Sequence, residues 1–189
     1  MAGFIAEHRK RSNDKLVNRI AVSKGDITKV DGMDAIVTAI FCNMDIVGSL
    51  NKSIIKAAGH EFDEFLLNNI FKPKPGDSFA VPGFKLPVDN VIIVAMPAHR
   101  DNFDREDFHL LRCYRHAMEV AVKMGMKNVA YPAIGTGQYG YPVDRAVRLA
   151  FKGIIERITG DIEQVKIVCN EQETFEAFNK RLNKYNRNK

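Results

Sequence analysis

Apolar residues follow two periodicities along this chain, and the two alternate from one end to the other. Short runs of β-branched and other apolar residues predict buried strands at residues 19–22, 35–40, 78–81, 90–95, 128–131 and 165–169. Apolar positions spaced i, i+3, i+4 and i+7 predict amphipathic helices at residues 50–58, 61–69, 105–124, 143–158 and 174–182. Ser49 and Gly59 are the expected caps of the first of these helices.

This alternation of strands and helices predicts an α/β fold. We expect a three-layer α/β/α sandwich built on a mixed, mostly parallel central sheet. The chain has no internal repeat and no linker, so residues 18–184 are expected to form a single domain between a basic arm at 1–17 and a basic tail at 185–189. Ligands of such sheets bind at the carboxyl ends of the strands. The loops that follow strands are therefore the candidate sites.

The composition is that of an ordinary globular protein, with 46% hydrophobic and 27% charged residues. It excludes a disordered chain, a collagen-like chain and a disulfide-stabilised miniprotein. The longest apolar run is about eight residues, against the ~20 that a membrane span requires, and no signal-peptide pattern opens the chain. Cys42, Cys113 and Cys169 are not paired at metal-binding spacing. We expect a cytoplasmic protein with reduced thiols and no bound metal.

The net charge of +5 is concentrated at the two ends of the chain. Residues 1–24 carry +4 and residues 180–189 carry +5, which leaves the body of the chain at −4. We expect solvated ends that aid solubility. The alternative is that these ends contact nucleic acid or an acidic partner. The sequence leaves the oligomeric state open, and a monomer is expected.

A glycine-rich loop follows the strand at 128–131 and leads into a helix. It reads Pro-Ala-Ile-Gly-Thr-Gly-Gln-Tyr-Gly-Tyr-Pro from Pro132 to Pro142. Its glycines would let the backbone approach a ligand closely, and N–H groups before a helix favour an anion. The spacing is that of neither a P-loop nor a dinucleotide-binding fingerprint. A plain turn and a cradle for a diphosphate are both open readings.

Two further loops follow strands. In residues 24–28, Lys-Gly-Asp-Ile-Thr, Asp26 either starts a short helix or presents a carboxylate to the edge of a nucleobase. Residues 38–49 follow the most buried strand and are unusually apolar for a loop. That composition indicates a segment that lines a pocket or packs inward.

Four segments in order carry a resemblance to a known family. They are Gly-Asp-Ile-Thr at 25–28, Asp-Ala-Ile-Val at 34–37, Lys-Ala-Ala-Gly at 56–59 and the glycine-rich stretch at 131–142. Together they resemble the macro domain, over residues 18–184. Macro domains bind ADP-ribose, and several hydrolyse ADP-ribosyl linkages or O-acetyl-ADP-ribose. The resemblance implies ADP-ribose, free or on a modified protein, as the ligand, with no metal or bound cofactor.

The resemblance also implies roles for individual residues. Asp26 would accept a hydrogen bond from the adenine amino group, and the backbone N–H of Ile27 would meet a ring nitrogen. The N–H groups that would hold the diphosphate belong to Gly135, Thr136, Gly137, Gln138 and Tyr139. The Tyr139 ring would also pack against the distal ribose, and Gly48 and Ser49 would close over the phosphates from the other side.

The chain departs from the family's pattern around this implied site. It has Phe41 at the second asparagine of the family's Asn-Ala-Ala-Asn, Ile46 and Val47 within the glycine run, Asn51 for an acid, Ile55 for a histidine and Asn170 for an aromatic that stacks on adenine. Asn51 cannot act as a carboxylate base, and Phe41 cannot hydrogen-bond a ribose hydroxyl. These changes leave the catalytic residues unassigned, with Asp45 as a candidate substitute base.

Three functions remain in competition at this point. We favour a binding module for ADP-ribose or a related nucleotide diphosphate that has lost the usual hydrolytic residues. The first alternative is an ADP-ribosyl hydrolase or O-acetyl-ADP-ribose deacetylase with a rebuilt site. The second is a non-catalytic interaction or RNA-binding protein that uses its basic ends.

Overall fold

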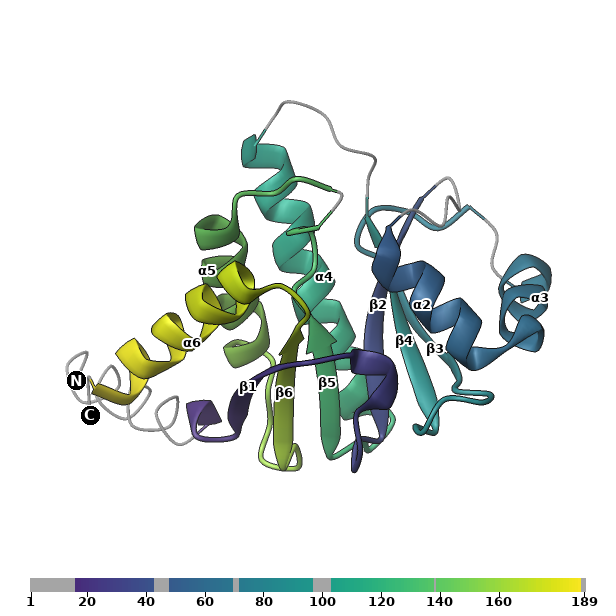
Figure 1. Ribbon diagram of the computed structural model, residues 1–189, viewed down its shortest axis with the longest axis horizontal. Coiled ribbons are helices and arrows are strands. Elements are labelled where there is room, and N and C mark those ends of the chain that lie inside the picture. Colours follow the sequence, from purple (N-terminus) through teal and green to yellow (C-terminus); the bar gives the residue numbers. More distant parts are fainter. Residues whose placement is uncertain (1–15, 43–47, 70–71, 97–102, 138, 188–189) are drawn as a thin grey trace.

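A six-stranded sheet forms the centre of the protein, in the order β1-β6-β5-β2-β4-β3 (Figure 1). The computed structural model describes residues 16–42, 48–69, 72–96, 103–137 and 139–187. The strands are β1 (Ile20–Lys24), β2 (Ala35–Phe41), β3 (Ser78–Pro82), β4 (Asn90–Met96), β5 (Asn128–Pro132) and β6 (Gln164–Cys169). The helices are the 3-10 turn η1 (Ile27–Lys29), α2 (Ser49–Ala58), α3 (His60–Asn69), α4 (Phe103–Lys123), α5 (Val143–Ile155) and α6 (Gln172–Arg187).

The sheet is mixed and mostly parallel, as predicted. β1 pairs with β6, β6 with β5, β5 with β2, and β2 with β4, all in parallel. Only the edge strand β3 runs antiparallel, against β4. The carboxyl ends of the five parallel strands therefore meet along one edge of the sheet, which is where ligands of such folds bind.

Helices cover both faces of the sheet, which confirms the three-layer sandwich. Alternate residues of β2 enter two different cores because successive side chains of a strand point to opposite faces. Ala35 and Val37 pack in the core under α4, α5 and α6, whereas Ile36 and Ile40 pack in the core under η1, α2 and α3. Figure 1 shows α6 and α3 at opposite ends of the molecule.

Helix ends differ from the sequence-based expectations in several places. Gly48, with φ +102°, stands at the N-cap position of α2, and Ser49 is the first helical residue, so the predicted Ser49 cap is wrong. α5 ends at Ile155 rather than at residue 158. α6 runs on to Arg187, so the first residues of the expected basic tail are helical. None of the helices in the described ranges has the length and apolar run needed to cross a membrane.

Candidate functional site

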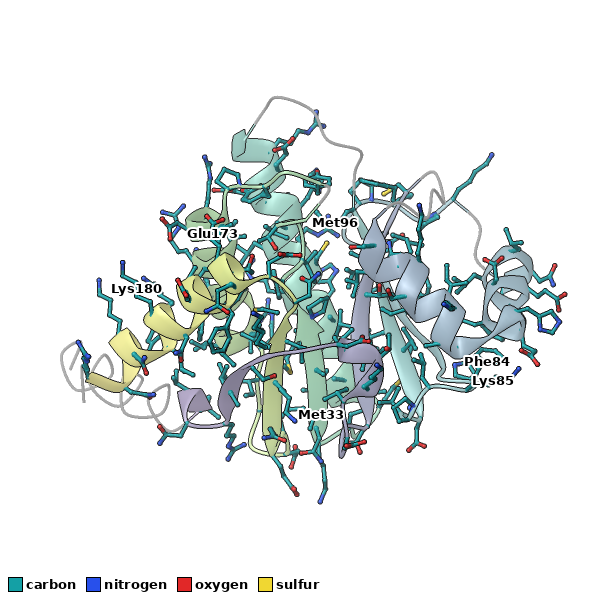
Figure 2. The ribbon with its side chains drawn as sticks, in the orientation of Figure 1. Met33, Phe84, Lys85, Met96, Glu173 and Lys180 are labelled. Carbon is teal, nitrogen blue, oxygen red and sulfur yellow. The ribbon has the colours of Figure 1, made fainter. Side chains whose placement is uncertain are left out.

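A cavity of about 320 Å³ opens at the carboxyl ends of β1, β2, β5 and β6. Met96, which lines it, lies at the carboxyl end of β4, whereas Met33 marks the opposite edge of the sheet (Figure 2). The lining residues are Gly25, Asp26, Ile27, Ala39, Ile40, Phe41, Gly48, Ser49, Leu50, Asn51, Ser53, Met96, Pro132, Ala133, Ile134, Gly135, Thr136, Gly137, Tyr139, Val168, Asn170 and Glu171.

Strand order arranges these residues along the cavity. β1 and β6 are neighbours at one side of the sheet, and the loops after them supply Asp26 and Asn170. β5 comes next and is followed by the glycine-rich loop. β2 and β4 lie beyond it and supply Phe41 and Met96. We call these two extremes the Asp26 end and the Phe41 end.

The glycine-rich loop, in the middle of the cavity, is folded so that some of its N–H groups donate no hydrogen bond within the described part of the chain. The Ile134 N–H donates to the hydroxyl of the buried Tyr114 on α4, at 2.9 Å, which anchors the loop. The Tyr141 N–H donates to the Gly135 carbonyl at 2.9 Å, and Gly135 takes φ +87°, a conformation that favours glycine. Among the described residues, the N–H groups of Gly135 and Gly137 donate no hydrogen bond.

The N-terminus of α2 faces the same cavity. No side chain of the described residues caps this end of the helix, and Gly48, Ser49 and Leu50 all line the cavity. The first N–H groups of a helix lack intrahelical partners and carry the positive end of the helix dipole. Two sets of backbone donors, one from α2 and one from the glycine-rich loop, thus border one space. Such an arrangement suits an extended anion.

Asp26 keeps a negative charge at its own end of the cavity. It is the N-cap of η1, where its Oδ1 accepts from the Thr28 hydroxyl at 2.7 Å and from the Thr28 N–H at 3.0 Å. The Thr28 hydroxyl bond lowers the pKa of Asp26, against the opposing effect of burial. Its Oδ2 lies 3.9 Å from Lys29 Nζ, and the side chain is 46% exposed. Asp26 is therefore an ionised hydrogen-bond acceptor at the rim.

The Phe41 end is aromatic, and its aromatic side chains are half-buried. The rings of Phe41 and Tyr139 stack with centroids 5.8 Å apart and planes 26° apart. Burial raises the pKa of Tyr139 to about 12, so its hydroxyl is protonated at neutral pH. Burial also raises the pKa of the Cys42 thiol, which directly follows Phe41. A neutral thiol is a poor nucleophile, so nucleophilic chemistry is not assigned to Cys42.

Asn51 is held by a buried hydrogen-bond pair that the sequence did not reveal. Its Oδ1 accepts from the Thr38 hydroxyl at 2.6 Å, and its Nδ2 donates to the Ala39 carbonyl at 2.6 Å. The residue is 7% exposed. These bonds tie the first turn of α2 to the carboxyl end of β2 and so hold the helix N-terminus toward the cavity.

Most of the residues singled out from the sequence meet at this cavity. Those that line it are Asp26, Ile27, Gly48, Ser49, Gly135, Thr136, Gly137, Tyr139 and Asn170, together with Phe41 and Asn51. Ile55 does not line it but packs against the core between α2 and the sheet. Gln138 and Asp45 lie outside the described residues, as do Ile46 and Val47. Sequence reasoning missed Met96, although it directly follows the predicted strand at 90–95.

The fold and the cavity define an α/β sandwich with a cavity bordered by backbone N–H groups at the carboxyl edge of its sheet. The model of the Macro domain family matches residues 37–150. The chain belongs to the macro domain family.

Several known proteins are similar along most of the chain. A macro domain-containing protein of Mesorhizobium japonicum is 33% identical, over 87% of this chain and 93% of its own. A Cronobacter turicensis protein named O-acetyl-ADP-ribose deacetylase is 31% identical, over 88% of this chain and 97% of its own. The Oceanobacillus iheyensis macrodomain, solved with ADP, superposes with a TM-score of 0.78 at 27% identity, covering 89% of this chain and 92% of that one.

Proposed function

We propose that this macro domain binds ADP-ribose or a related nucleoside diphosphate, free or attached to a protein. One observation carries the proposal: the N–H donors of the glycine-rich loop and of the α2 N-terminus border the same cavity. A diphosphate between them would receive hydrogen bonds from both sides. The relative from Oceanobacillus iheyensis, solved with ADP, supports this assignment.

The cavity is suited to binding the diphosphate without a metal. None of the described lining residues is Lys or Arg, so the favourable charge comes from backbone dipoles. Such donors are fixed in place and need no resident cofactor. At the Asp26 end, the ionised carboxylate would accept a hydrogen bond from the adenine amino group, and the Ile27 N–H would donate one to a ring nitrogen. Asn170 offers an amide there instead of a stacking ring.

Isothermal titration with ADP-ribose, with AMP as the comparison ligand, tests the proposal. We expect micromolar affinity for ADP-ribose and at least tenfold weaker binding of AMP, because AMP lacks the second phosphate. Absence of heat and of thermal stabilisation with millimolar ADP-ribose would contradict the proposal.

A matched pair of glycine variants locates the binding. A Cβ at Gly137 or at Gly160 meets nothing within 4 Å, so Gly137→Val and Gly160→Val should both fold. Only Gly137 lines the cavity, and a valine there would keep the diphosphate from the backbone. We expect Gly137→Val to weaken ADP-ribose binding at least tenfold and Gly160→Val to leave it unchanged. Equal affinities would place the ligand elsewhere.

Hydrolysis is a second candidate, favoured by the deacetylase name of the Cronobacter turicensis relative. Asn51 is not a catalytic base, because a side-chain amide is not basic and this one is engaged by Thr38 and Ala39. A hydrolase would need another base, for which Asp45 remains the candidate. Incubation with O-acetyl-ADP-ribose tests this: release of acetate that Asp45→Asn abolishes would establish the hydrolase. No turnover above the spontaneous rate would leave the binding function.

We also propose that the protein resides in the cytoplasm. The thiols of Cys42, Cys113 and Cys169 are all free. Free thiols fit the reducing cytoplasm expected from the sequence. Fractionation of cells that produce the protein, with a cytoplasmic and an envelope marker, tests it.

A further inference from the structure

The Phe41 end of the cavity is apolar on every side that β2 and β4 supply. Their lining residues are Ala39, Ile40, Phe41 and Met96. Phe41 and Met96 are register partners on the two strands, and the Cys42 N–H closes the pair with a 2.9 Å bond to the Met96 carbonyl. Tyr139 adds a second ring against Phe41. Because these residues line the cavity rather than fill it, space remains beside them for a ligand group.

Among the described residues, the side chains of β2 and β4 that line that space are apolar, so a sugar placed there would bury hydroxyl groups against them. Buried hydroxyls without hydrogen-bond partners are unfavourable. Within the described ranges, Asn51 is the polar lining side chain tied to the end of β2, and its amide already accepts from Thr38 and donates to Ala39. An apolar group in the same space would instead exchange water contact for contact with Phe41 and Met96.

The glycine-rich loop fixes which part of a ligand reaches this space. It follows β5, which lies between the Asp26 end and β2 in the sheet. A diphosphate held on the loop, with its base at the Asp26 end, directs the group on its second phosphate toward Phe41. The Phe41 end therefore selects between polar and apolar groups on the second phosphate.

We propose that the Phe41 end is a subsite for an apolar group carried on the second phosphate of a nucleoside diphosphate, and that it does not favour a sugar. This inference rests on the proposed function, since it takes the diphosphate site as given. It narrows the ligand class from ADP-ribose-like molecules in general to nucleoside diphosphates esterified with an aliphatic or aromatic group.

Three ligands that share the ADP moiety test the subsite: ADP, ADP-ribose and the phenyl ester of ADP at its second phosphate. We expect ADP-ribose to bind within threefold of ADP. The phenyl ester should bind at least tenfold tighter than ADP, a difference of about 1.4 kcal/mol. ADP-ribose tenfold tighter than ADP, or a phenyl ester no tighter than ADP, overturns the inference.

The same series separates the two proposals. If none of the three ligands binds, the proposed function fails and the subsite fails with it. If ADP binds but the expected order does not appear, the proposed function stands and only the subsite is lost. The affinity for ADP thus reports on one proposal, and the ratios to ADP report on the other.

Substitutions of Phe41 give a second, independent readout. Phe41→Asn should cut the advantage of the phenyl ester over ADP at least fivefold and improve ADP-ribose relative to ADP. Phe41→Leu keeps an apolar side chain and should preserve the order of the native protein even if Phe41→Asn folds poorly. Phe108→Asn is the matched control, because Phe108 is 54% exposed on α4 and does not line the cavity. Unchanged ratios in Phe41→Asn contradict the inference.

Discussion

Asn51 has a structural role at a position where the family resemblance implies a catalytic acid. It stands where the resemblance implies an acid, yet here it joins α2 to β2 through Thr38 and Ala39. The structure gives the side chain a mechanical role: it fixes the first turn of α2, whose N–H groups border the cavity. A buried amide with two short bonds is worth more to stability than an exposed one.

We predict that Asn51→Ala lowers the free energy of unfolding by about 1–3 kcal/mol, because it strands the Thr38 hydroxyl and the Ala39 carbonyl. Asn69→Ala is the matched control: Asn69 also donates to a backbone carbonyl, that of Phe65, but is exposed. Its effect should stay within about 0.5 kcal/mol. Urea unfolding measures both, and similar losses in the two variants would refute the role assigned to Asn51.

The acidity of Asp26 is set mainly by the Thr28 hydroxyl. We predict that Thr28→Val raises the pKa of Asp26 toward the ordinary aspartate value of 3.8, whereas Lys29→Gln has a smaller effect because the Lys29 charge contributes least to lowering that pKa. A carboxyl with a lowered pKa stabilises the fold above pH 3.8 and loses this contribution as the pH falls through its folded value. NMR titration of the Asp26 carboxyl carbon decides the matter; a larger shift in Lys29→Gln would reverse the assignment.

At the scale of helices and strands, most of the fold was predictable because periodicity in sequence is local. The apolar run at 35–40 and the apolar stripe along 143–158 each placed an element within a few residues. Helix ends were harder. Gly48 displaced Ser49 at the cap because the chain enters α2 with a positive φ, which a serine pattern does not signal. The turn η1, with Asp26 at its start, was only one of two open readings, because three residues show no period.

The candidate site likewise has features that the sequence predicts and features that it does not. The glycine-rich loop and Asp26 were predicted because each has a local sequence pattern. Side-chain partners far apart in the chain were not. The stacking of Phe41 on Tyr139 and the bond from Ile134 to Tyr114 depend on how β2, β5 and α4 are brought together. Nothing local to Phe41 or Tyr114 encodes its partner.

The contact between α4 and α5 is close enough to require a glycine. A Cβ added to Gly153 on α5 would lie 2.7 Å from the Cβ of Tyr114 and 3.1 Å from the Leu111 carbonyl oxygen. Alanine normally favours a helix over glycine. Here we predict that Gly153→Ala destabilises the protein by about 1–3 kcal/mol through overpacking.

Gly160→Ala is the control for that variant, since a Cβ there meets nothing within 4 Å. Its unfolding free energy should match that of the native protein to within about 0.5 kcal/mol. Thermal or urea unfolding compares the two. If Gly153→Ala proves as stable as Gly160→Ala, the two helices do not pack as closely as the structure shows.

Across the whole molecule, the cavity unites segments that are distant in sequence. The α2 N-terminus and the glycine-rich loop are separated along the chain by α3, β3, β4, α4 and β5, yet both line one space. The edge strand β3 contributes no residue to that lining. Ligand binding should therefore stabilise two separate stretches of backbone at once.

Hydrogen exchange tests this arrangement. With saturating ADP we expect slower exchange at Ser49, Leu50, Gly135 and Gly137, and no change along β3 (Ser78–Pro82), because only the first group faces the ligand. AMP at the same concentration serves as the comparison and should protect these amides less. Protection confined to one of the two stretches would mean that the diphosphate is not held from both sides.

The two hydrogen bonds that Asn51 makes, with Thr38 and with Ala39, limit which substitutions position 51 tolerates. Exchanging Asn51 alone for aspartate would set a carboxylate oxygen against the Ala39 carbonyl, which now accepts from the Asn51 amide. Residues in such direct contact typically show coupling energies of about 0.5–3 kcal/mol, so their substitutions are not additive. An aspartate could still accept from the Thr38 hydroxyl, so the unfavourable contact is the one with the Ala39 carbonyl. We therefore expect Asn51→Asp to destabilise the fold, and the size of the effect to depend on the residues that contact position 51.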